Sequence, residues 1–456
     1  MSAAPLPTTP ASPASATGAG LYRQSALIFG SSVISAALGL LLSVILARVL
    51  GPAEKGTYDL AMAAVLLLDA ALGFSLYMGV TYTVARAQGA PRGLLSAISA
   101  CVLAELALAA GVLALLFRLG AADLLLPSNA TLVLSAIVVL LLSVRSAALN
   151  WRAILMGAGR AHAASALDVT DRILQVVAIT VLLAVSQSVS AQVLLAGTLA
   201  AAVASQLLYY FAAARVPPAR DAFSFRDVLA YAWPCYAGNL VQFLNYRLDL
   251  FLVHAWAGLS SVGIYALAVS LAQLPWLLAR SAAGVLMPHV ARHQGDPAAA
   301  TLSAQMARIT LTCSALINIV LALTLPPLLP RVFGPAFAEA GPALLWLLPG
   351  TTVFALVMVL AAYLAGTGVP RINLYVALAG CTVTVAAGTW LIPLWGIRGA
   401  AITSSISYGL SALLTLIVFC CRTRTAFWDV LIPRWRDLQD IRNLQRTAPA
   451  SGGTPE

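Results

Sequence analysis

Residues Ser25 to Ala47 read SALIFGSSVISAALGLLLSVILA, a run of 23 residues without a charged side chain. A helix needs about 20 mostly apolar residues to cross the ~30 Å hydrocarbon core of a bilayer. The whole chain is 61% hydrophobic and only 9% charged, whereas soluble domains carry about 25% charged residues. So few charges cannot cover the surface of a water-soluble fold of 456 residues. The sequence therefore predicts an all-α integral membrane protein.

The same length criterion predicts about twelve transmembrane helices in two sets of six. The first set lies at residues 25–48, 59–84, 93–117, 130–156, 165–186 and 190–213. The second set lies at residues 229–256, 259–285, 303–326, 341–365, 371–392 and 396–421. The longest polar interval inside the chain, which contains Pro217 and Pro218, separates the two sets.

This pattern predicts five parts. They are a disordered cytoplasmic tail (1–22), an N-lobe of helices 1–6 (23–214), a cytoplasmic linker (215–227), a C-lobe of helices 7–12 (228–422) and a cytoplasmic tail (423–456). In the last part, apolar residues recur every three or four positions among arginines, at Leu431, Trp435, Leu438, Ile441 and Leu444. That spacing favours an amphipathic helix at the membrane surface. A frayed, solvated tail is the alternative.

Basic residues predict the orientation. Of the 26 Lys and Arg residues, 19 fall on the side of the N-terminus and five, Lys55 among them, fall on the opposite side. Because cytoplasmic loops carry the excess of Lys and Arg, both termini are expected in the cytoplasm. The net charge of +10 is thereby explained without a nucleic-acid partner.

Two short patterns repeat at nearly the same offset. Residues 51–61 (GPAEKGTYDLA) recur at 258–268 (GLSSVGIYALA), 207 positions later, and residues 155–159 (LMGAG) recur at 364–368 (LAGTG), 209 positions later. Six crossings per half make the halves parallel, as in transporters whose two lobes are related by an axis along the membrane normal. We therefore expect two six-helix lobes around a V-shaped central cavity.

The seventh span carries the most informative polar residues. Asn239, Gln242, Asn245, Tyr246 and Asp249 fall within an arc of about 120° on a helical wheel. One interpretation is a stripe that contacts substrate in the cavity. The other is hydrogen bonding between helices that only holds the bundle together.

Charged residues inside spans cost several kcal/mol and tend to face a cavity or a partner. Arg247 lies about 140° from the centre of the stripe, so it faces elsewhere unless the helix unwinds. The basic residues able to approach a cleft are Arg23, Arg48, Arg145 and Arg247. Asp69 and Glu105 are candidates for H⁺ or Na⁺ coupling, or partners of Arg145 and of each other. Nothing in the His and Cys spacing predicts a metal site, and no cofactor is expected.

The repeated patterns also resemble a known family. Ala47-Arg48-Val49-Leu50-Gly51-Pro52 with Gly56-x-Tyr58-x-Leu60-Ala61, and Arg247-Leu248-Asp249 with Gly263-Ile264-Tyr265-x-Leu267-Ala268, resemble the signatures of bacterial polysaccharide-export flippases. These belong to the superfamily that includes the MATE drug exporters and the lipid II flippases. The resemblance covers most of residues 21–421, although many relatives have fourteen spans.

The resemblance implies a flippase of the bacterial inner membrane, not an enzyme, that moves undecaprenyl-diphosphate-linked oligosaccharide from the cytoplasmic to the outer leaflet by alternating access. It implies membrane lipid, a polysaccharide polymerase and a chain-length regulator as partners. Arginine suits such a cargo because it binds phosphate oxygens bidentately. Two alternatives remain at this point: an ion-coupled exporter of drugs or small metabolites, and a membrane glycosyltransferase or polymerase.

Overall fold

The computed structural model describes residues 18–434, except 88, 128–129, 187–188, 220–223, 294–295 and 370, and gives side chains from residue 29 onward, except Pro234. Residues 1–17 and 435–456, which include most of both predicted tails, lie outside the described residues. Within the described part every regular element is a helix, and the β pairing there is one isolated bridge between Ala90 and Pro218.

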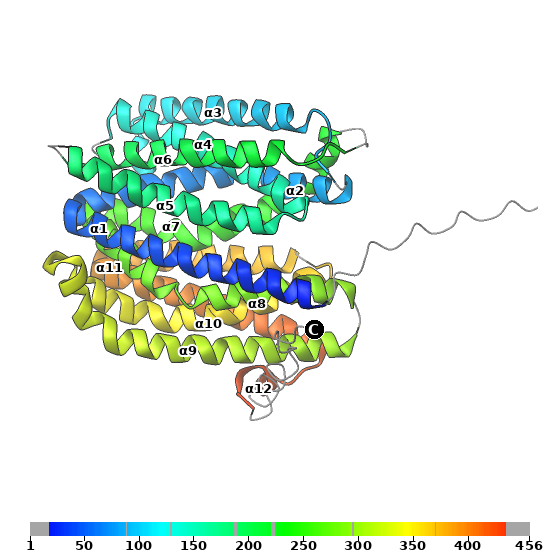
Figure 1. Ribbon diagram of the computed structural model, residues 1–456. Coiled ribbons are helices and arrows are strands. Elements are labelled where there is room, and N and C mark those ends of the chain that lie inside the picture. Colours follow the sequence, from blue (N-terminus) through cyan, green and yellow to red (C-terminus); the bar gives the residue numbers. More distant parts are fainter. Residues whose placement is uncertain are drawn as a thin grey trace, which may run out of the picture.

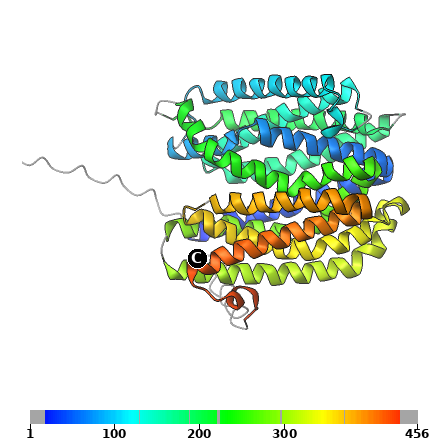
Figure 2. The ribbon, with the colours of Figure 1, turned by 180° about the vertical axis from the view of Figure 1, so that it is seen from behind.

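The helices form two groups that follow each other in the sequence (Figures 1 and 2). The first half consists of α1 (Gly18–Leu72), α2 (Leu76–Ala87), α3 (Leu94–Arg118), η1 (Ala122–Leu124), α4 (Leu132–Gly157), α5 (Ala161–Val185) and α6 (Ala191–Ala214). The second half consists of α7 (Phe225–Ala272), α8 (Trp276–Arg292), α9 (Pro297–Phe333), η2 (Pro335–Phe337), α10 (Ala340–Gly366) and α11 (Arg371–Thr423), and is followed by α12 (Phe427–Leu431).

Three of these helices are hairpins of two antiparallel segments. α1 reverses at Gly51 (φ 68°, ψ 179°), α7 at Gly258 (φ 78°, ψ 175°) and α11 at Gly396 (φ 56°, ψ −133°). A positive φ of this kind is readily adopted only by glycine. All three reversals lie at one end of the bundle, here called the hairpin end, and the opposite end, where α1 begins and α11 ends, is called the terminal end (Figure 1).

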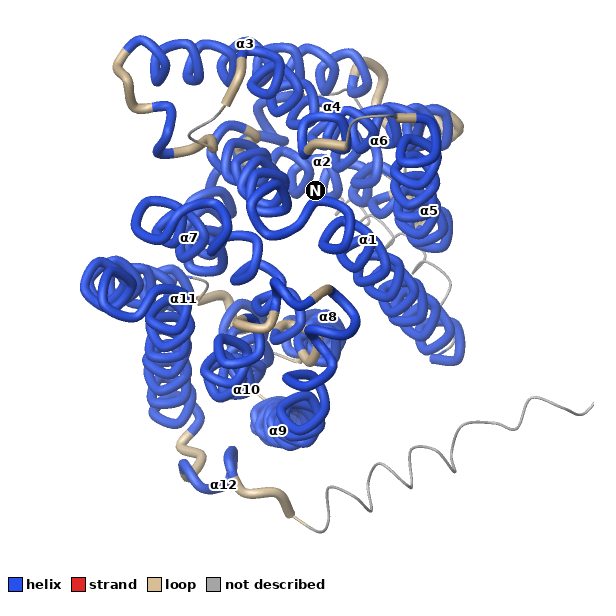
Figure 3. The backbone as a smooth tube through the Cα atoms, turned by 90° about the vertical axis from the view of Figure 1, so that its left-hand side faces the viewer, coloured by secondary structure: helices blue, strands red, loops and turns tan. Residues whose placement is uncertain are grey.

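The described residues thus make twelve crossings. Eight helical stretches are long and apolar enough to span a membrane, three of them contain a reversal and cross twice, and α5 crosses beside them. The protein is a multi-pass membrane protein, and the predicted fold of two six-helix halves is confirmed. In the end-on view of Figure 3, α2–α6 and α8–α11 form separate groups, with α1 and α7 placed between them.

The repeated patterns prove to be equivalent contacts of a two-fold arrangement. A Cβ atom at Gly56 would lie 1.8 Å from the Leu259 carbonyl oxygen, and one at Gly263 would lie 2.2 Å from the Pro52 carbonyl oxygen. Leu259 is itself 207 residues after Pro52. The two halves therefore cross backbone against backbone at these glycines, which leaves no room for a side chain.

The same equivalence holds inside each half. A Cβ atom at Gly157 would lie 2.6 Å from the Thr81 carbonyl oxygen, and one at Gly366 would lie 2.9 Å from that of Met287, 206 residues after Thr81. These glycines let α4 pack closely on α2, and α10 on α8. The repeat detected in the sequence is thus a repeat of packing.

Two expectations need correction. The second span, expected as a continuous helix over 59–84, is broken at residues 73–75 between α1 and α2. Lys55, expected in an outer loop, lies inside α1 with only 2% of its surface exposed and pairs with Asp59 one turn later. Because the reversal needs only Gly51, helix resumes at once and carries Lys55 into the contact between the halves.

Candidate functional site

The polar residues of α7 point in several directions. Asp249 and Asn245 are 3% and 5% exposed and turn into the second half. The Asp249 carboxylate accepts hydrogen bonds from the Tyr265 hydroxyl at 2.7 Å and the Ser404 hydroxyl at 3.0 Å. The Asn245 side-chain oxygen accepts one from Ser407 at 3.2 Å. For these two residues the structure shows hydrogen bonding between helices of one half.

Tyr246 belongs to an aromatic cluster in the same half. Its ring centroid lies 5.4 Å from that of Trp276 and 5.6 Å from that of Phe354. Gln242 is half-buried, and its Nε2 atom has no hydrogen-bond partner within the described residues. The predicted stripe therefore does not face one common cavity.

Asn239 lies nearer the terminal end and faces the other half. Its Nδ2 atom donates to the Ser75 hydroxyl at 3.0 Å, and the Tyr236 hydroxyl, one turn earlier, donates to the Ala71 carbonyl at 2.7 Å. Ala71 lies just before the break between α1 and α2, and Ser75 lies in it. Side chains of the second half thus satisfy polar groups at a break in a membrane-spanning helix of the first half.

Arg145 and Arg247 are arginines inside membrane-spanning helices, one in each half. Both are half-buried, and neither makes a hydrogen bond or an ion pair within the described residues. Arg145, on α4, interacts electrostatically with Arg172 and Asp171 on α5 and with Asp69 and Tyr58 on α1. Arg247, on α7, interacts with Asp59 on α1 and with Asp249. The two guanidinium groups therefore approach the same segment of α1, residues 52–72, one from each half.

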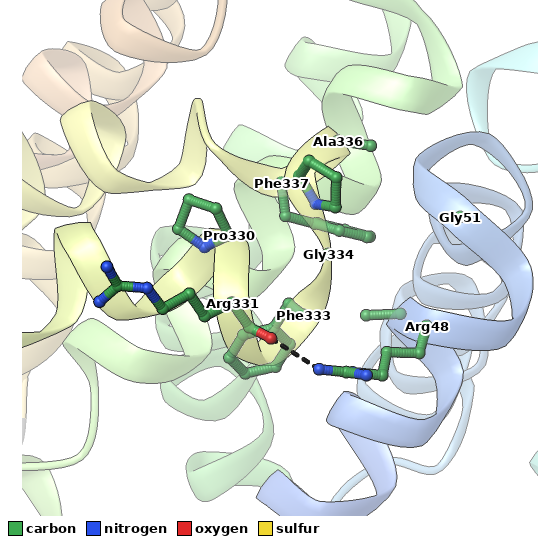
Figure 4. A pocket seen from close by; sticks show the side chains of 10 residues that line it. Arg48, Gly51, Pro330, Arg331, Phe333, Gly334, Ala336 and Phe337 are labelled. Carbon is green, nitrogen blue, oxygen red and sulfur yellow. Dashed lines mark hydrogen bonds between the residues drawn. The ribbon is translucent and has the colours of Figure 1, made fainter.

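Arg48 links the halves at the hairpin end (Figure 4). Its Nε and Nη2 atoms donate to the carbonyl oxygens of Val332 and Arg331, both at 2.6 Å. These carbonyls belong to the last turn of α9, where the helix dipole favours a positive charge. A cavity of about 520 Å³ adjoins this contact. Its lining comes from α1, from the end of α9 and from η2: Ala47, Arg48, Gly51, Pro330, Arg331 and residues 333–337.

Asp69 and Glu105 are brought together around Gly73. The position that a Cβ atom of Gly73 would take lies 3.3 Å from Asp69 Oδ1 and 3.5 Å from Glu105 Oε1. Glu105, only 5% exposed, also accepts a hydrogen bond from Ser146 at 2.5 Å. Arg23 lies on α1, but its side chain is outside the described part of the structure.

Some polar residues at these positions escaped the sequence analysis. Ser404, Ser407 and Ser411 are almost fully buried on one face of α11, and the first two bond to α7. Their spacing of three and four residues is a helical period that marks one face. Serine occurs on every kind of helix face, however, so the spacing gave a weaker signal than a charge. Within the described residues, no group of three His, Cys, Asp or Glu side chains is placed to hold a metal ion.

Two parallel halves of six membrane-spanning helices, each with an arginine that makes no hydrogen bond within the described residues, are the architecture of membrane transporters. The fold is similar to that of "Lipid II flippase MurJ, inward closed conformation", at 13% identity over 93% of this chain and 94% of that one, with a TM-score of 0.68. It is similar to an outward-facing multidrug resistance MATE family transporter of the MOP superfamily, at 16% identity over 90% and 98% of the two chains, with a TM-score of 0.65. It also resembles the Vibrio cholerae MATE transporter VcmN, at 12% identity over 89% and 97%, with a TM-score of 0.62.

The profile of one sequence family, described as "Polysaccharide biosynthesis protein", matches residues 21–294, which is more than half of the chain. The chain therefore belongs to that family. No match was found among curated proteins. The predicted membership of a polysaccharide flippase family within a MATE-like superfamily is confirmed at this level, and the families concerned are those of transporters rather than enzymes.

Proposed function

We propose that this protein is a flippase that moves a polyprenyl-diphosphate-linked oligosaccharide from the cytoplasmic to the outer leaflet of the bacterial inner membrane. Membership of the polysaccharide biosynthesis family supports a cargo of this class. The observation that carries the proposal is the pair Arg145 and Arg247, one from each half, which have no anionic partner within hydrogen-bonding distance in the described protein.

An arginine without an ion pair in a membrane bundle is costly, by several kcal/mol. A diphosphate group offers the missing charge, and the planar guanidinium binds phosphate oxygens in a bidentate manner. The polyprenyl tail remains in lipid while the charged group and the sugars move between the halves. Arg145 and Arg247 would then hold the diphosphate from opposite halves during the passage.

The two halves also suit alternating access. Their backbone crossing at Gly56 and Gly263 and the Arg48 contact join them near the hairpin end. At the other end, α2 and the start of α7 join them, where the Tyr82 and Tyr231 rings stack at 4.2 Å. Contacts near each end that form and break in turn would expose the arginines first to one leaflet and then to the other.

The test is a flipping assay with the protein reconstituted in liposomes. A fluorescent polyprenyl-diphosphate-linked oligosaccharide placed in one leaflet is monitored through its accessibility to an added quencher. We expect Arg145→Gln and Arg247→Gln each to slow flipping by about tenfold or more, because a charge-assisted hydrogen bond is worth about 1.5–3 kcal/mol. Arg118→Gln is the matched control, because Arg118 is exposed at the end of α3.

The assay also separates the alternatives. Wild-type protein that leaves the lipid-linked sugar in place but moves a small cationic drug would support the exporter interpretation. Wild-type protein that lengthens the sugar chain from an activated donor would support a glycosyltransferase or polymerase. Equal flipping rates in the wild type and both arginine variants would contradict the assigned role of the arginines.

A further inference from the structure

A second cavity, of about 220 Å³, lies beside the break between α1 and α2. Most of its lining is apolar, contributed by the break itself, by α3 and by the first turns of α7. The polar groups in its lining come from Glu105 on α3 and from Ser146 and Asn150 on α4. Leu108 and Leu229, which line its edge on α3 and α7, are 51% and 40% exposed, so the cavity opens toward lipid.

Two buried oxygen atoms in this cavity lack a hydrogen-bond donor. Glu105 Oε1 and Asn150 Oδ1 have no partner within the described residues, although Glu105 and Asn150 are 95% and 96% buried. The other carboxylate oxygen of Glu105 accepts from Ser146, and the Asn150 side-chain nitrogen donates to the Ser146 carbonyl. Two acceptors without a donor are an unfavourable arrangement in an apolar cavity, at about 1–3 kcal/mol for each.

We propose that Glu105 is a proton-binding site, with Asn150 as the acceptor for its proton and Asp69 as the carboxylate through which the proton arrives. A proton on Glu105 Oε1 turns one acceptor into a donor, and in the proposed arrangement Asn150 Oδ1, which belongs to the lining of the same cavity, is its acceptor. It also removes the negative charge that Glu105 would otherwise place next to Asp69 at Gly73. One proton would therefore satisfy both oxygen atoms that lack a donor and would relieve the repulsion between Glu105 and Asp69.

The titratable and charged neighbours of Glu105 are compatible with proton binding at its carboxyl group. Asp69 of α1 is half-buried and within electrostatic reach, Cys101 of α3 lies one turn before Glu105, and Tyr77 of α2 interacts with Asp69. Arg145 of α4 is a cation whose charge acts on Asp69. The lining from α7, Phe225 and Leu229, is apolar. A metal ion would need several oxygen ligands, whereas a proton needs one donor position and one acceptor.

The site adjoins a strained hinge. Phe74 and Ser75 adopt φ angles of 48° and 50°, the left-handed region that non-glycine residues rarely occupy. This break is held by α7 of the other half, through the hydrogen bonds from Tyr236 and Asn239 described above. A change of charge at Glu105 and Asp69 therefore acts next to the segment that carries the contact between the halves.

Proton binding is tested independently of transport with dicyclohexylcarbodiimide. This apolar reagent enters from lipid and reacts with a protonated carboxyl group, and the adduct is located by mass spectrometry. We expect an adduct on Glu105 that decreases about tenfold for each pH unit above its midpoint, and none in Glu105→Gln. Glu339, exposed at the hairpin end, is the internal control and is expected to carry no adduct.

Two variants in the cavity give opposite shifts if the hydrogen bonds are as proposed. Asn150→Ala removes the acceptor of the neutral carboxyl group and should move the midpoint of labelling to lower pH. Ser146→Ala removes the donor to the carboxylate and should move it to higher pH, each by about half a pH unit to one pH unit. Shifts in the same direction would overturn the assignment. If sodium chloride protected Glu105 from labelling more than choline chloride did at the same pH, the assignment of a proton-binding site would be overturned and a sodium site indicated.

The coupling of this proton to movement rests on the proposed flippase function. In liposomes with a pH gradient, we expect wild-type flipping to follow the gradient and Glu105→Gln flipping to be independent of it. Glu105→Gln that retains full dependence on the gradient would overturn the coupling. Wild-type protein that moves no lipid-linked sugar would instead contradict the flippase proposal and leave the labelling result standing.

Discussion

At the scale of single residues, Gly56 and Gly263 are required by the closeness of two backbones rather than by an unusual backbone angle. We expect Gly263→Ala to destabilise the protein by about 1–3 kcal/mol, because its Cβ would lie 2.2 Å from the Pro52 carbonyl oxygen. The measurement is thermal unfolding in detergent. Gly39→Ala in α1 is the control, since nothing lies within 4 Å of its Cβ position. Equal melting temperatures for the two variants would contradict the close crossing.

Tyr58 and Tyr265 occupy equivalent positions in the two halves and form a matched pair. The Tyr58 hydroxyl hydrogen-bonds to Thr198 at 2.9 Å, whereas the Tyr265 hydroxyl donates to Asp249 at 2.7 Å. A hydrogen bond to a charged group contributes about 1.5–3 kcal/mol and a neutral one about 1 kcal/mol. We therefore expect Tyr265→Phe to lower the free energy of unfolding more than Tyr58→Phe. Equal losses in a denaturation series would show that the Asp249 bond is not a major contributor.

Most of these residues could be singled out from the sequence, but the directions in which their side chains point could not. A helical wheel separates Arg247 from Asp249, and the structure indeed keeps Arg247 out of the Asp249 hydrogen-bond network. The wheel does not say which neighbour each side meets, because that depends on how α7 packs between the two halves. Lys55 was placed outside for a similar reason, since nothing local shows that the chain reverses within the single residue Gly51.

At the scale of elements, the break between α1 and α2 could not be predicted from the pattern of apolar residues. Residues 59–84 read as one continuous span, and only Gly73 marks a weak point. Phe74 and Ser75 hold their positive φ angles because Tyr236 and Asn239 of α7 satisfy the neighbouring polar groups. Those residues lie about 160 positions away in sequence, beyond the reach of local propensity.

At the same scale, Arg48 connects α1 to the end of α9 through its hydrogen bonds. We expect Arg48→Ala to widen the hairpin end, because it removes both hydrogen bonds to the carbonyls of Arg331 and Val332. Spin labels at Arg118→Cys and Trp395→Cys, both exposed at that end, would report longer distances in a variant without the six native cysteines. Arg331→Gln is the control, since Arg331 contributes its backbone oxygen to the contact. An unchanged distance distribution in Arg48→Ala would exclude this link.

At the scale of the whole molecule, composition and span length were sufficient to predict the fold class. The offset between the patterns around Gly56 and Gly263 was sufficient to predict two equivalent halves. These properties are distributed over hundreds of residues, so local errors do not change them. The cavities could not be predicted, because each is formed by side chains from distant helices. Glu105 was recognised as an unusual charge, whereas Asn150 and Ser146 became informative only as its neighbours.

The orientation of the molecule yields a separate prediction. Because basic residues concentrate at the terminal end, we expect that end in the cytoplasm. An impermeant thiol reagent added to intact spheroplasts should label cysteines placed at Arg118 and Trp395, and should label those at Arg160 and Arg422 only after lysis. All four side chains are exposed. The reverse pattern would invert the assigned topology.

While the terminal end opens and the hairpin end stays closed, the crossing of Gly56 and Gly263 would serve each half as a pivot near the hairpin end. A helix such as α9, with 37 residues, is about 55 Å long at 1.5 Å per residue. A tilt of about 10° at the pivot then displaces the far end of such a helix by about 10 Å. Two glycines in van der Waals contact would thus convert a sub-ångström sliding of backbone on backbone into an opening as wide as a sugar ring.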